Sequence, residues 1–388
     1  MKQIRVLGAG MTKFGERWDK SLVDLAEEAG MKAVKDAHLE LKDLSTLFIG
    51  NMLSASVTGQ EHLGALMAER LGLKIPAIRI EGACASGAMA IHQACLAIAS
   101  GYYQNVLVIG VEKMTDLSTA EINRALMGAS AEAEEGVNGF TFASLYALMA
   151  RAYMEKYGLK EKDLAQVAVK NHYHASLNPL AQFPFKVSLK QVIESPMVAD
   201  PLKVFDCSPI TDGAAAVVMS NGQWTMNNGQ IPISIIGSSL VSDTLSLSAR
   251  KEIIEQEATQ KAVQEALKMA GIKLEEVDLA EVHDCFTIAE IISLESLGFF
   301  KKGTAGKATT RGETSLDGKL PVNPSGGLKA CGHPVGATGV KQIVELVLQL
   351  RGKAGKRQVR KARIGLAQNI GGSGSTAVIH ILKRENHV

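Results

Sequence analysis

The sequence predicts an α/β protein made of two similar halves, and three observations lead to this prediction. Short apolar runs alternate with longer amphipathic stretches, the order that a sheet with helical crossovers produces. A similar order returns after residue 250. Residues 262–284 echo residues 33–51, because in both a helix runs through an acidic turn into an apolar strand. The chain therefore reads as an internal duplication.

The composition is that of a well-buried soluble protein with room for two domains. Of 388 residues, 46% are hydrophobic and 21% are charged. The formal net charge of +2 predicts no nucleic-acid partner and no anionic membrane surface. The longest uninterrupted apolar runs, such as residues 106–111, are far shorter than the roughly 20 residues of a spanning helix. With no secretory signal visible at the start, we expect a cytoplasmic protein.

In the first half, each expected element follows from its apolar pattern and the turn residues beside it. A glycine-rich stretch, residues 8–15, lacks the third glycine of a dinucleotide site and predicts a tight turn after the first strand. A second helix and strand pair, 339–350 followed by 364–374, echoes the helix after Cys84 and its strand. The expected strands are 4–10, 44–53, 75–80 and 105–112, and the expected helices are 21–37, 61–72 and 85–100.

Between the halves, residues 115–205 break this rhythm with methionines and few clean strands. We expect an inserted loop domain lying over the site. The predicted domains are a first half of residues 1–114 and 206–245, this insertion, and a second half of residues 246–388.

Cys84 is the first candidate for a catalytic residue. It is expected on a sharp turn between a strand and a helix, where unpaired backbone N–H groups and the helix dipole favour a thiolate. Small neighbours, Gly82 and Gly87 among them, allow close approach of a substrate. A buried structural thiol is the commoner fate of cysteine, but this turn and its glycines have no need of sulfur. Cys95, in mid-helix among apolar residues, is expected in the core.

The other cysteines give no sign of a structural framework. The five cysteines are odd in number and show no C-x-x-C spacing, which argues against disulfides and against a zinc ribbon.

Two histidines are candidates for the base that a nucleophile needs. His283 follows an apolar strand, and His333 precedes a proline, which presents its imidazole from a loop. Either histidine alone is as easily structural as catalytic. Beside Cys84, at corresponding strand ends of two duplicated halves, the catalytic interpretation is favoured.

Five stretches together resemble the thiolase superfamily over almost the whole chain. "VHDCF" replaces the N-E-A-F of the bacterial-type enzymes and "NIGGSGS" replaces their C-x-G-G-G, departures similar to the sterol-carrier-protein-X type and to the archaeal acetoacetyl-CoA thiolases. The resemblance implies the thiolase fold: duplicated βαβαβ halves packed as a five-layered αβαβα sandwich with an inserted loop domain. The stretches are "GACASGAMAI" (82–91), "DCSPITDGAAAVV" (206–218), "VHDCF" (282–286), "NPSGGLKACGHPVGATG" (323–339) and "NIGGSGS" (369–375).

The resemblance also implies an activity, the reversible condensation of two acetyl-CoA to acetoacetyl-CoA and CoA. Cys84 would carry the acetyl group, and His333 would activate it. His333 and His283 would polarise the enolate oxygen, while the backbone N–H groups of Cys84 and Gly371 would hold the tetrahedral intermediate. Cys285 would move the α-proton, although Cys331, two residues from His333, stays an alternative. No metal and no permanently bound cofactor are expected, since CoA thioesters are the substrates.

The resemblance further implies partners and a pathway. A homodimer or homotetramer is expected, with a complex to 3-hydroxy-3-methylglutaryl-CoA synthase through a small OB-fold zinc protein, at the first step of the mevalonate pathway. The end at Val388 predicts a single module without a sterol-carrier domain or a peroxisomal S-K-L signal.

Other functions are kept as alternatives. One is a 3-ketoacyl-CoA thiolase of broader chain length, of the sterol-carrier type. A cysteine hydrolase of α/β type would need an acid and would explain neither the duplication nor a second reactive cysteine. A decarboxylating ketosynthase would need malonyl thioesters, and an inactive scaffold would not need its reactive residues intact.

Two further features carry less weight. His172 and His174 would face the same way in a strand, but no third ligand is nearby, so no metal site is expected. Residues 351–363 hold seven basic residues and no acid. They could attract CoA phosphates or a partner protein, although a solvated connection between the last helix and the last strand is the preferred interpretation.

Overall fold

The computed structural model describes residues 3–221 and 231–385, and its two halves repeat one order of elements. The first half is β1 (Ile4–Met11), α1 (Leu22–Asp36), β2 (Thr46–Gly50), α2 (Ser54–Thr58), α3 (Leu63–Arg70), β3 (Ala77–Ile80), α4 (Ser86–Ser100), β4 (Asn105–Glu112) and β7 (Gly213–Ser220).

The second half repeats this order from strand to helix to strand, except that an isolated bridge between Ala280 and Val322 stands in the place of β3 among the described residues. Even the short 3₁₀ turn before β2, Leu41–Asp43, has its counterpart before β9, Leu274–Glu276, so the predicted duplication is confirmed. The elements are β8 (Ile233–Ser242), α9 (Glu257–Ala270), β9 (Leu279–Glu281), α10 (Thr287–Ser296), α11 (Ala305–Thr310), α12 (Gly327–Cys331), α13 (Val335–Arg351), β10 (Ile364–Gly371) and β11 (Thr376–Arg384).

Each half contributes one group of strands to a continuous mixed sheet of nine strands in the order β3-β2-β4-β7-β1-β8-β11-β10-β9. The two groups join where β1 and β8 pair at three positions, Ile4–Val6 with Ile233–Ile235, whereas β8 pairs with β11 at nine. Strand β8 therefore belongs with the second half, and the assignment of 206–245 to the first half is corrected. The change of half falls between β7 and β8.

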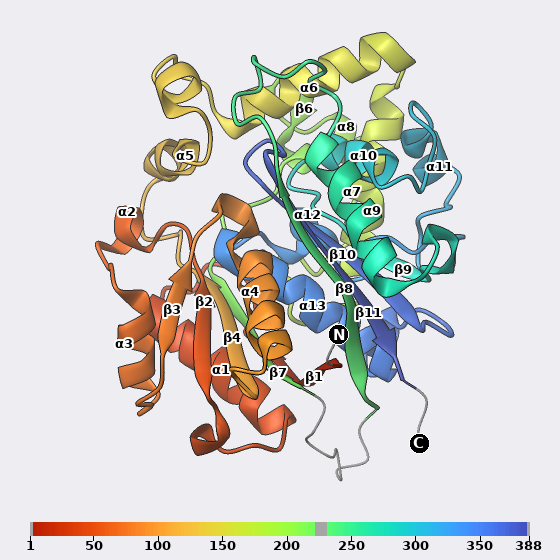
Figure 1. Ribbon diagram of the computed structural model, residues 1–388. Helices are drawn as coiled ribbons and strands as arrows, with labels where there is room; N and C mark the ends of the chain where they lie inside the picture. The colour runs from red at the N-terminus through yellow and green to blue at the C-terminus, as the bar shows by residue number, and fades with distance from the viewer. Residues whose placement is uncertain (1–2, 222–230, 386–388) are drawn as a thin grey trace.

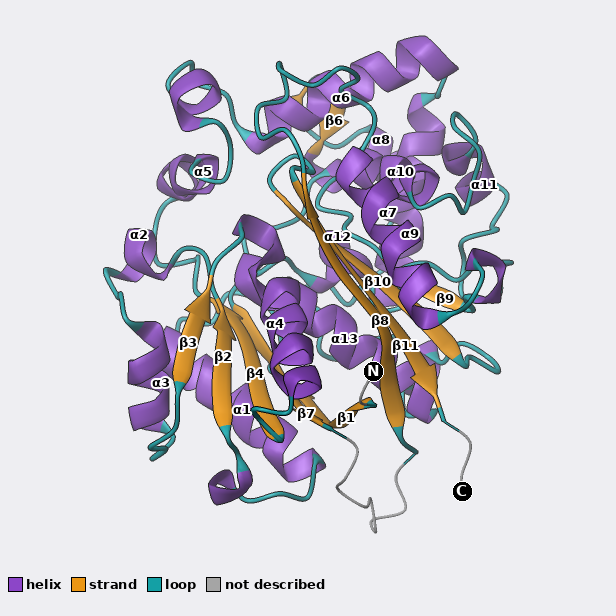
Figure 2. Cartoon of the chain, viewed as in Figure 1, coloured by secondary structure: helices purple, strands orange, loops and turns teal. Residues whose placement is uncertain are grey.

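Side chains that alternate along the strands divide the molecule into five layers, αβαβα (Figure 2). In β4, Leu107 and Ile109 face the outer helices α1 and α3, while Val106 and Val108 face the central helices α4 and α13. Because successive strand residues point to opposite faces, each strand serves two apolar layers. Helices α9 and α10 cover the outer face of the strands that the second half contributes (Figure 1).

Helix α4 is the central helix of the fold and is strongly apolar. Its segment Ala83–Ser100 is long and apolar enough to cross a membrane, with 18 residues and a mean hydropathy of 1.3, but 56% of it is buried inside the protein. A core helix between two sheets passes the same test, so the burial accounts for the composition. Polar and small residues such as Ser86, His92 and Gln93 interrupt this segment, so it does not form one continuous apolar run.

The glycine-rich stretch near the start is not a turn. Gly8 and Gly10 lie inside β1 and face α1, where a Cβ on Gly8 would stand 2.1 Å from the Ala33 carbonyl oxygen. These glycines let a helix pack closely on a strand. A pattern of glycines alone does not distinguish this use from a turn.

The inserted segment is mainly helical rather than loop-like. Its helices share one apolar core with the second half, since Tyr146, Tyr153 and Leu164 pack with residues of α10. The segment contains α5 (Thr119–Met127), a π-helical turn (Glu132–Gly136), α6 (Phe142–Tyr157), α7 (Glu161–Ala175), α8 (Leu189–Ile193), β5 (Met197–Ala199) and β6 (Leu202–Lys203).

The basic stretch 351–363 connects α13 to β10, which is not the last strand of the chain. It is solvated only in part, because Arg351 pairs with Asp36 at 2.7 Å and Arg357 pairs with Glu345 at 2.9 Å while both arginines are buried. It precedes β10, whereas the candidate site described below lies beyond the opposite end of that strand.

Candidate active site

The turn that carries Cys84 has an unusual backbone. Ala83 adopts a left-handed conformation (φ 54°), which costs about 1 kcal/mol for a residue with a Cβ. The Ser86 hydroxyl stabilises the turn by donating to the Ala83 carbonyl at 2.6 Å, and it accepts from the Gly82 N–H at 3.0 Å. A Cβ on Gly82 would stand 2.0 Å from the Met89 sulfur. The predicted sharp turn before the helix is confirmed, with Cys84 at its apex.

Cys84 and His333 meet because α4 and α13 pack together through glycines close to their N-termini. A Cβ on Gly87 would stand 2.6 Å from the Gly336 carbonyl oxygen, and one on Gly339 would stand 2.2 Å from the Ala88 nitrogen. Each helix is preceded by a loop that carries a reactive side chain. The close helix contact therefore brings together two residues about 250 positions apart in the sequence.

The hydrogen bonds of His333 leave it one free basic nitrogen. Its Nδ1 lies 2.7 Å from the Thr338 hydroxyl, and that hydroxyl donates its own proton to the Pro334 carbonyl at 3.1 Å. Thr338 must then accept from Nδ1–H, so the unprotonated nitrogen is Nε2. Burial, with a smaller contribution from the Lys341 charge, lowers the pKa of His333 to about 3. The imidazole is therefore a neutral base.

His283 has the opposite tautomer. Its Nδ1 accepts from the Asn369 amide at 2.9 Å and from the Ile370 backbone N–H at 3.5 Å, which places the proton on Nε2. Burial first, and then electrostatic interaction with His333 and Lys341, lower the pKa of His283 well below its ordinary value. The buried Nε2–H has no hydrogen-bond partner among the residues that the structure describes. It is a hydrogen-bond donor available to an oxygen of a bound molecule.

Cys84, His283 and His333 place their ligand atoms within 4.8 Å of one another, a spacing that a metal ion could also use. The two imidazole rings lie edge to face at 5.0 Å. A metal ligand must offer a lone pair, however, and the Nε2 of His283 carries a proton as long as Ile370 donates to Nδ1. The hydrogen bonds therefore fit an oxyanion better than a metal.

The thiol of Cys84 is neutral, which differs from the expected thiolate. Burial, and then the nearby Glu112 carboxylate, raise the pKa of Cys84 to about 12. Hydrogen bonds from the backbone N–H groups of Gly372 and Cys84 act in the opposite direction without outweighing burial. The thiol proton must therefore pass to a base as the sulfur attacks, since Cys84 is not a thiolate before substrate binds.

The backbone N–H that hydrogen-bonds the Cys84 sulfur belongs to Gly372 and not to the predicted Gly371. Gly372 lies on the turn between β10 and β11 with φ 62°, and it lines the cavity, while Gly371 is the last residue of β10. A Cβ on Gly372 would stand 2.7 Å from the Ala129 carbonyl oxygen. The motif was found from sequence, but which of two adjacent glycines faces the sulfur depends on where β10 ends.

Cys285 lies in the same cavity as Cys84, and Cys331 does not. Cys331 is fully buried in α12, packed in the central apolar layer with the Asn178 amide 3.6 Å from its sulfur. Cys95 is also in that layer, as predicted. Burial raises the pKa of Cys285 well above its ordinary value. Geometry thus favours Cys285 as the second reactive cysteine.

One cavity of about 230 Å³ contains these groups together with residues that sequence reasoning missed. Tyr146 and Phe142 come from α6 in the inserted segment, and Cys207 comes from the loop before β7. No sequence motif marks Tyr146. The lining residues are Cys84, Met114, Thr119, Asn123, Leu126, Phe142, Ala143, Tyr146, Val198, Cys207, Ser208, Pro209, Ile210, His283, Cys285, Phe286, His333, Val335 and Gly372.

His172 and His174 lie outside this cavity, in helix α7 and not in a strand. Residues two apart on a helix do not share a face, so the expectation that they face the same way is wrong. Both are buried, and their Nδ1 atoms bond to the backbone carbonyls of Phe185 and Asn323 at 3.2 and 3.0 Å. They are structural residues.

Two family models match the chain: "Thiolase, N-terminal domain" over residues 4–223 and "Thiolase C-terminal domain-like" over residues 237–384. The acetyl-CoA acetyltransferase of Methanothermobacter thermautotrophicus is 48% identical over 99% of this chain and 100% of its own length. The acetyl-CoA acetyltransferase of Methanocaldococcus jannaschii is 46% identical, over 98% and 99%. Sterol carrier protein 2 of Gallus gallus is 34% identical, over 97% of this chain and 71% of its own.

Solved structures share the fold along the whole chain. The Ltp2-ChsH2(DUF35) aldolase has a TM-score of 0.87 at 25% identity, covering 100% of this chain and 99% of its own. Human mitochondrial 3-ketoacyl-CoA thiolase has a TM-score of 0.77 at 20% identity, covering 99% of both chains. The second likeness concerns the fold alone.

Proposed function

The chain belongs to the thiolase family, and from this premise we propose that it is an acetoacetyl-CoA thiolase that condenses two acetyl-CoA to acetoacetyl-CoA and CoA. One observation carries the proposal: Cys84, His283, Cys285 and His333 converge in one cavity. Two archaeal relatives named acetyl-CoA acetyltransferase align along the full chain and support the choice of acetyl groups.

In the first half-reaction, the Cys84 sulfur attacks the thioester carbon of acetyl-CoA while His333 Nε2 takes the thiol proton. The tetrahedral oxyanion accepts hydrogen bonds from the backbone N–H groups of Cys84 and Gly372, which already point at the sulfur. When the intermediate collapses, the C–S bond to CoA breaks, and the departing thiolate takes the proton of Cys285. Acetyl-Cys84, an imidazolium at His333 and a thiolate at Cys285 remain.

In the second half-reaction, the Cys285 thiolate removes a proton from the methyl group of a second acetyl-CoA. The enolate oxygen accepts from His283 Nε2–H and from the His333 imidazolium. The enolate carbon attacks acetyl-Cys84, the new C–C bond forms, and the Cys84 sulfur departs with the proton of His333. All groups return to their first protonation state, so the cycle balances.

The hydrogen bond to His333 also bears on the hydrolase alternative. A cysteine hydrolase of the α/β type would orient its histidine with an acid, but Nδ1 of His333 donates to the Thr338 hydroxyl. A thiolase needs no such acid. A thiolase is therefore consistent with Thr338 as the hydrogen-bond partner of His333 Nδ1.

Steady-state thiolysis tests the function. The purified chain is given CoA with acetoacetyl-CoA and, in parallel, with 3-ketoacyl-CoA of longer chains, and the loss of the 3-ketoacyl thioester and of free CoA is followed. We expect turnover to be fastest with acetoacetyl-CoA. Faster turnover with long chains would indicate the broader sterol-carrier-type enzyme, and loss of thioester without CoA consumption would indicate a hydrolase.

We extend the proposal to the setting of the enzyme: a cytoplasmic homodimer or homotetramer at the first step of the mevalonate pathway, in complex with 3-hydroxy-3-methylglutaryl-CoA synthase through an OB-fold zinc protein. Condensation of two thioesters is uphill, so a partner that consumes the product would sustain the flux. The name of the aldolase neighbour includes a DUF35 component, which supports a bridging subunit of that kind. Co-expression and gel filtration should show co-elution, and separate elution at micromolar concentrations would contradict it.

A further inference from the structure

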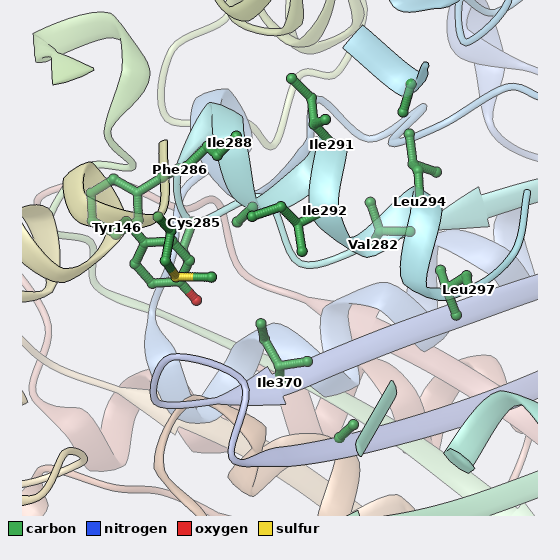
Figure 3. Packing of buried hydrophobic residues seen from close by; sticks show 14 of the residues in the cluster. Tyr146, Val282, Cys285, Phe286, Ile288, Ile291, Ile292, Leu294, Leu297 and Ile370 are labelled. Atoms are coloured by element: carbon green, nitrogen blue, oxygen red, sulfur yellow. The ribbon is translucent and has the colours of Figure 1, made fainter. Parts of the chain in front are cut away.

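Tyr146 is a buried polar residue at the active cavity to which the reaction above gives no role. It comes from α6, is 0% exposed, and stacks its ring on Phe286 at 4.7 Å and 27°. Its hydroxyl donates to the Gly372 carbonyl at 3.3 Å. Figure 3 shows the hydroxyl oxygen next to the Cys285 sulfur, to which it is hydrogen-bonded.

The groups around Cys285 and Tyr146 indicate that the Tyr146 hydroxyl acts on the ionisation of Cys285. Three ionisable side chains act on Cys285: Tyr146 of α6, Cys84 on the turn before α4, and Asp284, its neighbour in the chain. Burial, Cys84 and Asp284 all raise the pKa of Cys285, and the hydrogen bonds from Tyr146 and from the Phe286 backbone lower it. Arg250 is the cation that faces Tyr146. It donates to the Ser373 carbonyl at 2.7 Å and so stabilises the turn between β10 and β11 that carries Gly372.

The geometry points to Tyr146 as a positioning residue that hydrogen-bonds the Cys285 sulfur in both of its protonation states. When Cys285 is a thiol, its S–H donates to the phenol oxygen while the phenol O–H donates to the Gly372 carbonyl. When Cys285 is a thiolate, the phenol O–H turns to the sulfur. The inference rests on the proposed role of Cys285 in proton transfer.

The phenol itself does not give up its proton in this scheme. Burial, and then the adjacent Cys285, raise the pKa of Tyr146 well above its ordinary value, so the hydroxyl is a donor throughout the cycle. The proton that reaches CoA comes from Cys285, and the proton that returns comes from the substrate methyl group. Tyr146 only rotates its O–H between two acceptors, which costs little in a site already formed.

The test measures the ionisation of Cys285 without any substrate. In a Cys84→Ala protein, Cys285 is alkylated with iodoacetamide across pH 6–10, and its peptide is quantified by mass spectrometry. Adding Tyr146→Phe keeps the stacked ring and removes only the oxygen. We expect the alkylation rate of Cys285 at pH 8 to fall about tenfold and its pH profile to move upward by about one unit, because a hydrogen bond to a charged group is lost.

Tyr153→Phe is the matched control. Tyr153 lies on the same helix, is equally buried, and donates to Glu295 at 2.5 Å away from the cavity. Its loss should lower the melting temperature without moving the alkylation profile. An identical profile for Tyr146→Phe and its parent would overturn the inference.

A second measurement separates this inference from the proposed function. With Cys84 intact, Tyr146→Phe should still be acetylated at Cys84 but should condense on the order of tenfold more slowly. Equal condensation rates would overturn the role of Tyr146 while leaving the thiolase activity of the unmodified enzyme standing. An unmodified enzyme without thiolysis would instead overturn the proposed function, whatever the alkylation profile shows.

Discussion

Two histidines of the same chemistry take opposite roles because of residues that never touch substrate. Thr338 and the Pro334 carbonyl leave His333 with a free Nε2 lone pair, whereas Asn369 and the Ile370 N–H leave His283 with an Nε2 proton. Burial keeps both neutral at pH 7. One is thus a base and the other a donor before any substrate binds.

Thr338→Val should remove the hydrogen bond that selects the tautomer of His333 without changing the side chain's shape. We expect the rate of Cys84 acetylation to fall on the order of 10- to 100-fold with little change in the affinity for acetyl-CoA. Single-turnover acetylation, quenched and quantified on the Cys84 peptide, measures this. Thr314→Val is the control, since Thr314 is buried and donates only to Thr309. Equal acetylation rates in both variants would show that Thr338 does not set the tautomer.

Cys285→Ala should abolish condensation and thiolysis and still allow acetylation of Cys84. The loss should be on the order of 10²-fold or more, as for other lost acid–base groups. Cys331→Ala should stay largely active, because Cys331 packs in the central layer and is not among the residues that line the cavity. Steady-state thiolysis measures turnover in both variants, and peptide mass analysis measures the acetylation of Cys84. An inert Cys331→Ala beside an active Cys285→Ala would move the proton-transfer role to the G-H-P loop.

At the scale of elements, the central helices α4 and α13 determine where the reactive groups lie. Their contact is so close that glycine is the only residue that fits at the crossing. A Cβ on Gly339 would stand 2.2 Å from the Ala88 nitrogen and 2.5 Å from the Asn369 side-chain oxygen. Asn369 also donates to His283 Nδ1, so a shift at the helix crossing would change the position of His283.

Gly339→Ala should therefore destabilise the protein although alanine is the better helix former. The nearest atom is the Ala88 backbone nitrogen, and the Ala88 Cβ is fixed to the same backbone, so neither can move aside without shifting α4. We therefore expect a loss of about 1–3 kcal/mol in the free energy of unfolding, together with reduced thiolysis. Gly30→Ala in α1 is the control, because there the nearest atom is the end of the Ile109 side chain at 3.0 Å. Urea denaturation measures both. Equal stability of the two variants would mean that the helix crossing has room to adjust.

At the scale of the whole molecule, burial leaves many histidines neutral. Burial within the layers desolvates these side chains, and desolvation disfavours the charged imidazole. The pKa of His172 falls to about 4 and that of His380 to about 3, and burial is the first cause in each. The pKa is lowered in His92, His172, His174, His283, His333 and His380.

The protein should consequently lose stability as the pH falls from 6.5 to 4.5. In this window the unfolded chain protonates these histidines and the native state does not, so unfolding takes up protons and acid favours it. Three buried carboxyls with raised pKa values, Asp206, Glu112 and Asp284, oppose the effect because the native state holds their protons. Six histidines outweigh them, and a net loss on the order of 3 kcal/mol is expected. Urea denaturation at several pH values measures it, and a flat profile would contradict the prediction.

The sequence by itself determined the duplicated α/β architecture, the turn at Cys84 and the candidate residues His283, Cys285 and His333. These follow from local patterns: apolar periodicity, glycine and proline at turns, and short motifs whose residues are neighbours in the chain. The same local patterns failed at Gly8 and Gly10, because a glycine pattern does not say whether a turn or a packed helix requires it.

Only the tertiary structure decided which of these residues meet and what each can do. Tyr146 joins Cys285 from a helix more than a hundred residues away, and no local pattern records such a contact. Gly372 replaces Gly371 because the last ladder position of β10 fixes which N–H turns toward Cys84. Burial turns the expected thiolate into a neutral thiol. Side-chain pKa values, tautomers and cavities depend on desolvation and long-range packing, which arise only when the chain is folded.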